Sequence, residues 1–167
     1  MQNIKTSKNK GITLIEVMVS LVFLSTGLIP LFGVVISAIN LSVRIKSNLV
    51  AANLAQEGVE IVRALRDKAW MDDAPFNRDL TPGNHLVSWD SDSLLFYNPN
   101  SYIKFNSATG IYSQTTGIDT IFKRRINIVL VPSTCNCEVI VTSNVSWLEK
   151  SIAHSIVVEG HLFDWKQ

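Results

Sequence analysis

The sequence predicts an α+β protein in which one long N-terminal helix precedes a C-terminal antiparallel sheet. Three observations support this fold class. Residues 12–39 form an almost continuous apolar run, the residues that follow repeat apolar side chains at helical spacing, and residues 121–165 hold three runs that alternate apolar and polar side chains. The 167 residues suit one compact domain plus a membrane segment. The net charge of +1, with no clustered Lys and Arg, argues against a nucleic-acid-binding face.

Residues 1–11 form a short basic leader, and an apolar segment follows at residues 12–43. The leader carries Lys5, Lys8 and Lys10 and no acid, whereas Glu16 is the only ionisable side chain of the apolar segment. About 20 apolar residues span a bilayer, so this segment predicts a transmembrane helix. A secretory signal would have a shorter apolar core followed by a small-residue cleavage site, which is missing here. The basic leader favours a cytoplasmic N-terminus, with residues 44–167 as a globular domain outside the cytoplasm.

The same helix is expected to continue to about Asp67, with residues 44–67 amphipathic. One face repeats apolar side chains at steps of three or four, namely Leu41, Ile45, Leu49, Ala52, Ala55, Val59, Val62, Leu65 and Ala69. Pro30 lies inside the apolar half between Gly27 and Gly33. Proline removes a backbone hydrogen bond, so a kink or local melting is predicted at Pro30.

Residues 70–120 are loop-rich, with dense turn signals and short strands expected at 86–89, 101–105 and 110–114. Residues 121–165 predict a three-stranded β-meander with strands at 121–131, 137–147 and 151–163. Each strand has one apolar face, formed by Phe122, Ile126, Ile128 and Leu130, by Val139, Val141, Val145 and Trp147, and by Ile156, Val158 and Leu162. The helical stripe from Leu41 to Leu65 is the expected cover for this face.

The residues K-G-I-T-L-I-E-V at 10–17 resemble the processing site of type IV prepilins: a basic leader ending in Gly, an apolar residue, then Glu at the head of an apolar helix. The resemblance implies a pilin-like fold and a prepilin peptidase that cuts between Gly11 and Ile12 and N-methylates Ile12. It also implies that the Glu16 carboxylate pairs with an Ile12 amine during assembly with other pilin subunits at an inner-membrane assembly platform. The protein would then be a single-pass inner-membrane protein that enters a surface pilus or pseudopilus.

The segment LAQEGVEIVRALRD (54–67) and the ending L-F-D-W (162–165) are more loosely similar to minor, pilus-modifying pilins. The function expected is therefore that of a minor pilin of a type IV pilus. Two alternatives stay open: a minor pseudopilin of a type II secretion or DNA-uptake system, and a single-span membrane-anchored binding protein. Glu16 has an alternative too, since a carboxylate near a helix end can simply reach the lipid headgroups.

No enzyme active site, cofactor or metal site is expected. His85, His154 and His161 are scattered, and the last two are predicted on opposite faces of one strand. Asp90 and Asp92 could contribute to a calcium loop, but they lack its Gly and distal Glu, so a solvated turn is expected. Cys135 and Cys137 are one residue apart, a spacing that strains a disulfide, so two thiols near a turn are expected, with a strained bridge or a bond to another chain as alternatives.

Overall fold

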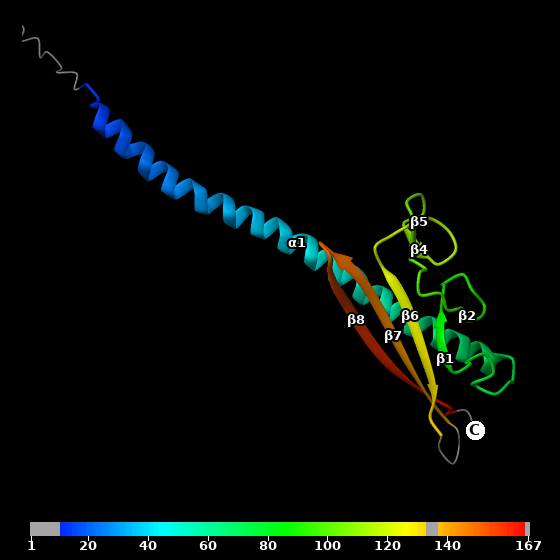
Figure 1. Ribbon diagram of the computed structural model, residues 1–167. Helices are drawn as coiled ribbons and strands as arrows, with labels where there is room; N and C mark the ends of the chain where they lie inside the picture. Colours follow the sequence, from blue (N-terminus) through cyan, green and yellow to red (C-terminus); the bar gives the residue numbers. More distant parts are fainter. Residues whose placement is uncertain (1–10, 133–136, 166–167) are drawn as a thin grey trace, which may run out of the picture. The chain divides into compact units, whose positions relative to one another are not determined.

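The computed structural model describes residues 11–132 and 137–165 (Figure 1). One α-helix, α1, runs from Leu14 to Met71 and confirms the expected long N-terminal helix. The chain forms two compact units whose boundary falls inside α1, after Ile45. The expected α+β class is confirmed, because an antiparallel sheet follows the helix.

The first unit, up to Ile45, consists of the apolar part of α1 in its described residues. Its large apolar side chains are exposed, and an 18-residue window has a mean hydropathy of 2.3, so α1 is long and apolar enough to cross a membrane. The helix continues through Pro30 without a break, so the expected local melting does not occur there.

The hydroxyl groups of this apolar unit bond to the helix itself. Ser20 Oγ donates to the Glu16 carbonyl at 2.8 Å, Thr26 Oγ1 to the Val22 carbonyl at 2.9 Å, and Ser37 Oγ to the Gly33 carbonyl at 2.9 Å. Such i to i−4 bonds satisfy a hydroxyl where no water is present. These three side chains are therefore compatible with a lipid environment.

The second unit, from Lys46 onward, contains the rest of α1 and all eight strands. Its main sheet has the order β2-β1-β6-β7-β8, built from β1 (Gly83–Leu86), β2 (Leu95–Phe96), β6 (Lys123–Leu130), β7 (Glu138–Glu149) and β8 (Ile152–Phe163). A smaller sheet has the order β4-β3-β5, from β3 (Lys104–Asn106), β4 (Ile111–Ser113) and β5 (Ile118–Asp119). All strand pairs are antiparallel.

The expected meander is confirmed as β6-β7-β8, but it forms only part of the main sheet. β1 pairs with β6 and ends at Leu86, so the expected strand at 86–89 is shifted, and β2 and β5 were not expected. The strands at 101–105 and 110–114 are shorter than expected, as β3 and β4.

The alternating apolar faces of β6, β7 and β8 pack against α1, as expected from their pattern. The core contains Val59, Val62 and Leu65 of the helix together with Ile126, Val139, Val141 and Leu162 of the sheet. A second cluster joins Ala51, Leu54 and Ala55 to Ile103, Phe122, Val145 and Trp147. The expectation that the helical stripe covers the sheet from Leu41 onward was wrong in its first part. Leu49 is 61% exposed, and Leu41 and Ile45 belong to the other unit. The buried part of the stripe begins at Ala51.

Glycine allows the helix to approach the sheet closely. A Cβ at Gly58 would lie 2.6 Å from Ser143 Oγ and 2.8 Å from Ile126 Cδ1, and a Cβ at Gly160 would lie 2.7 Å from Val59 Cγ1. All three distances are shorter than van der Waals contact. Gly58 on α1 and Gly160 on β8 therefore determine how near the two layers come.

Candidate functional site

The residues of the expected processing site lie at the start of α1. Gly11, Ile12 and Thr13 precede the helix and are exposed, with Ile12 77% exposed. A Cβ at Gly11 would meet nothing within 4 Å, and Gly11 does not have the left-handed φ that favours glycine. Neither close packing nor backbone conformation therefore requires glycine at this position.

Thr13 lies immediately before the first turn of the helix, and Glu16 lies in that turn. The Thr13 carbonyl accepts hydrogen bonds from the Glu16 amide at 3.1 Å and the Val17 amide at 3.3 Å. T-L-I-E has the Thr-x-x-Glu spacing of a capping box, in which the acid occupies the third helical position. An acid in the first turn also interacts favourably with the helix dipole. This Thr-x-x-Glu spacing was not among the expectations drawn from the sequence, although it is visible there.

Ile12 and Glu16 are one helical turn apart at the start of the apolar unit, and Ser20 and Leu24 continue the same face. Cleavage after Gly11 would place a charged amine on Ile12, within one turn of the Glu16 carboxylate. In a bundle of such helices, the carboxylate of one chain could equally meet the amine of another. The Glu16 carboxylate and the amine that cleavage would create on Ile12 would therefore lie close together at the start of the apolar part of α1.

A buried ion pair joins α1 to the sheet in the second unit. Arg124 on β6 has a side chain that is 1% exposed; it donates to the Leu54 carbonyl at 3.0 Å and the Val87 carbonyl at 2.6 Å, and Nη1 lies 3.2 Å from Glu57 Oε1. Burial lowers the pKa of the Arg124 guanidinium, and Glu57 opposes that shift. Removing one partner of such a pair leaves an uncompensated charge, so Arg124 has a structural role here.

The three histidines lie apart and have local partners. His85 Nε2 is 2.8 Å from the Thr81 carbonyl, and the His154 ring stacks on Trp147 with centroids 5.4 Å apart. His161 Nδ1 is 2.7 Å from Glu138 Oε1, and this contact raises the pKa of His161 above its ordinary value. His154 lies on the helix-facing side of β8 and His161 on the other, as predicted.

The two acids of the possible calcium loop also have separate partners. Asp90 accepts hydrogen bonds from Ser88 and Thr115, which lower the pKa of its carboxyl, whereas Asp92 pairs with Lys68 at 2.9 Å. Within residues 11–132 and 137–165, no three His, Cys, Asp or Glu side chains form a group that could hold a metal ion.

The expectation of two free thiols is wrong for Cys137, which is disulfide-bonded. Cys135 is the only other cysteine of the sequence and lies outside the described residues. The disulfide bond of Cys137 agrees with the alternatives in which this thiol is bonded, and not with a free thiol.

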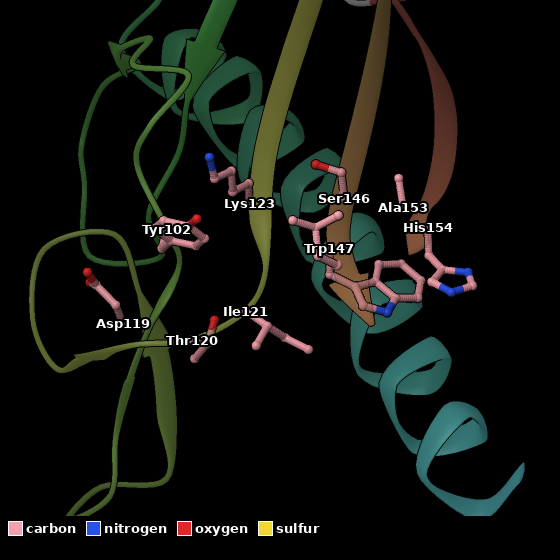
Figure 2. Close-up of a pocket in the computed structure, with 10 residues that line it drawn as sticks. Tyr102, Asp119, Thr120, Ile121, Lys123, Ser146, Trp147, Ala153 and His154 are labelled. Atoms are coloured by element: carbon pink, nitrogen blue, oxygen red, sulfur yellow. The ribbon is translucent and has the colours of Figure 1, made fainter. Parts of the chain in front are cut away.

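A cleft of about 580 Å³ lies at the end of the main sheet where β6 begins. Figure 2 shows Tyr102 and Lys123 on one side, Trp147 and His154 on the other, and Ile121 between them. The Lys123 ammonium lies over the Tyr102 ring, 4.5 Å from its centroid. Sequence analysis missed this cleft, because its residues come from four separate segments whose meeting depends on the sheet topology.

Comparison with known proteins gives no relative: no protein-family model, no curated protein and no solved structure matches this chain. Function is therefore inferred from the residues and their geometry.

Proposed function

We propose that this protein is a type IV pilin-like subunit, processed by a prepilin peptidase after Gly11 and assembled through the apolar part of α1 into a pilus. The observation that supports this most directly is the start of the helix. An exposed glycine with no structural role precedes α1, whose apolar part up to Val43 has Glu16 as its only ionisable side chain. Each part has a function in such a subunit. Gly11 allows the backbone to enter the protease active site, and the apolar part of α1 lies in the membrane. Glu16 provides the polar contact for assembly.

The apolar unit suits two successive environments. Its side chains are exposed all round the helix, and Ser20, Thr26 and Ser37 satisfy their hydroxyls within it. Such a surface can face lipid in a single-pass inner-membrane precursor, with the second unit outside the cytoplasm. It can also pack against neighbouring helices in a filament core. The pilin fold, in which such a helix covers an antiparallel sheet, is part of this proposal.

The role of a minor, pilus-modifying subunit is the form we favour, on the looser resemblance of residues 54–67 and 162–165. A minor pseudopilin of a type II secretion or DNA-uptake system would share the same processing site and the same helix. A permanently anchored binding protein would keep the leader, and its size would therefore distinguish it from both.

The test is co-expression of the full chain with a prepilin peptidase. Wild-type protein should lose residues 1–11, and mass spectrometry should find a methylated Ile12 at the new N-terminus. Gly11→Val should leave the precursor at full length, because the side chain blocks the protease cleft. Gly27→Val is a matched control, since a Cβ at Gly27 also meets nothing within 4 Å, and this variant should be processed normally. A wild-type chain that stays at full length with an active peptidase present would overturn the proposal.

A further inference from the structure

The cleft at the end of the main sheet arises from a difference in strand length. β6 begins at Lys123, opposite Ser146, so residues Trp147 to Glu149 of β7 pair with β8 alone in the described register. The chain before β6, from Asp119 to Ile121, lines the other side of the resulting gap. The cleft therefore lies beside the tip of the β7–β8 hairpin.

Several large apolar side chains are exposed around this cleft. Ile121 is 48% exposed, Leu148 63% and Ile152 62%, and the last two stand at the hairpin tip. A group of exposed aliphatic side chains on a folded unit marks a surface that contacts something other than water.

The position of the cleft along the chain indicates what that contact is. Trp147, which lines the cleft, packs in one cluster with Ala51 and Leu54 of α1. Ala51 is eight residues after Val43, the last residue of the uncharged segment. Eight residues span about 12 Å as a helix and at most about 29 Å fully extended. Chain connectivity alone therefore tethers Ala51 within about 29 Å of the end of the apolar segment.

The charges at this end complement an anionic surface. Three cations belong to this part of the second unit: Lys46 shortly before Ala51, Lys123 in the cleft and Lys150 in the hairpin turn. Asp119 in the cleft and Glu149 beside the turn are the acids that oppose them. The excess of positive charge favours anionic phospholipid headgroups, which attract basic side chains by about 1 kcal/mol each, a change of about fivefold in affinity.

We propose that the cleft and the β7–β8 hairpin tip bind anionic phospholipid headgroups on the outer face of the membrane that anchors the chain. Leu148 and Ile152 enter the interface, and Lys123 and Lys150 meet lipid phosphates. This inference rests on the membrane anchoring in the proposed function. It adds that the globular unit is itself held on the bilayer, so that leaving the membrane requires the release of two contacts, the apolar helix and the hairpin tip.

The experiment uses the full chain in nanodiscs of phosphatidylcholine alone and of phosphatidylcholine with phosphatidylglycerol. Hydrogen exchange is followed in peptides that cover residues 117–124 and 146–155. Exchange in both peptides should be at least about fivefold slower with phosphatidylglycerol, the effect of one basic contact. The double variants Lys123→Gln/Lys150→Gln and Leu148→Ser/Ile152→Ser should each lose this difference. Phe96→Ser is the matched control, since Phe96 is 97% exposed on β2, and it should keep the difference.

Three outcomes would overturn the inference. Equal exchange in the two lipids would show that the negative charge of the headgroups does not contribute to binding. Unchanged protection in both double variants would show that the cleft and the hairpin tip are not the binding surface. Protection that appears only when a second protein is added would make the cleft a protein-binding site instead. Failure of the chain to float with lipid vesicles would count against membrane anchoring itself, whereas normal flotation and normal processing without lipid-dependent protection would reject this inference alone.

Discussion

At the scale of a single residue, the position of Glu16 suits two proposed roles. It occupies the third position of α1, where an acid suits both the capping box with Thr13 and the helix dipole. It is also the only ionisable residue between Gly11 and Val43. A carboxylate inside a bilayer costs up to about 2.5–3.5 kcal/mol at the centre, so a partner amine would relieve that cost. The two roles depend on different properties of the side chain, because capping needs a hydrogen-bond acceptor and assembly needs the charge.

Substitution of Glu16 distinguishes these roles. Glu16→Ala should be processed normally but enter filaments about tenfold less, since the loss of roughly 1.4 kcal/mol of pairing changes an equilibrium tenfold. Glu16→Gln keeps an acceptor that suits the capping box and loses the charge, so it should fail as Glu16→Ala does. The measurement is the ratio of filament-bound to membrane-bound subunit on immunoblots. Ser20→Ala, on the same face one turn later, should assemble normally.

Two results would contradict the charge role. Normal incorporation of Glu16→Ala would show that the carboxylate is not an assembly contact. Rescue by Glu16→Gln would show that helix capping, and not pairing with an amine, is what Glu16 contributes.

Arg124 shows why residue identity alone did not reveal the buried ion pair. It alternates with Phe122 and Ile126 on the helix-facing side of β6, but its charge suggests a solvated position. In the sequence, the only sign that Arg124 is buried is its place in the alternating pattern of the strand, which puts it on the apolar face. Its partners Leu54, Glu57 and Val87 come from α1 and from the segment after β1, so they could not be named before the fold was known.

At the scale of elements, the β7–β8 hairpin has an unfavourable turn sequence. Lys150 and Ser151 form the two-residue loop, with φ of 48° and 66°. Turns of this kind, with two left-handed residues, favour Asn-Gly, because other side chains crowd the backbone. The hairpin thus holds an exposed tip in a conformation that its turn residues do not themselves favour.

Ser151→Gly should therefore stabilise the protein. Relief of the left-handed conformation contributes about 1–2 kcal/mol and the flexibility of glycine costs about 0.5–1 kcal/mol, so unfolding should become roughly 0.5–1 kcal/mol less favourable. Urea unfolding of the full chain in mild detergent, followed by tryptophan fluorescence, measures the change. Ser155→Gly on β8, outside the turn, should have the opposite sign, since glycine weakens a strand. A lower urea midpoint for Ser151→Gly would contradict this account of the turn.

Long periodic elements could be predicted from the sequence, whereas short ones could not. α1 and the meander β6-β7-β8 extend over many residues, so their periodicity is clear. β2 and β5 have two residues each and depend on pairing with β1 and β3, for which no local pattern exists. The stripe from Leu41 to Leu49 was expected in the core because helical spacing does not distinguish a core face from an exposed one.

At the scale of the whole molecule, both core clusters lie in the second unit, whereas the large apolar side chains of the first unit are exposed. The large exposed apolar side chains are concentrated between Ile12 and Leu49, whereas both core clusters begin at Ala51 or later. Contacts that stabilise the second unit therefore lie within residues 46–167. The candidate processing site could be found from sequence because its residues are contiguous, whereas the cleft needed the full topology of the second unit.

A chain that begins at Lys46 should fold without the first unit. It should be soluble and monomeric, because it lacks the apolar run but keeps both clusters. Circular dichroism and sedimentation of residues 46–167 provide the measurement, with the full chain, expected in the membrane fraction, as the comparison. Aggregation of the shortened chain, or loss of its sheet signal, would show that the second unit depends on the first.

Hydroxyl groups of the apolar unit donate hydrogen bonds to carbonyls of α1 itself, and this affects how readily the helix can exchange lipid neighbours for protein neighbours. Because Ser20, Thr26 and Ser37 each hold their hydrogen bond within α1, exchanging lipid neighbours for protein neighbours breaks none of these three bonds. The two environments then differ little in free energy as far as these groups are concerned. In the proposed pilin, these three hydroxyl groups would therefore favour neither transfer into the filament nor return to the bilayer.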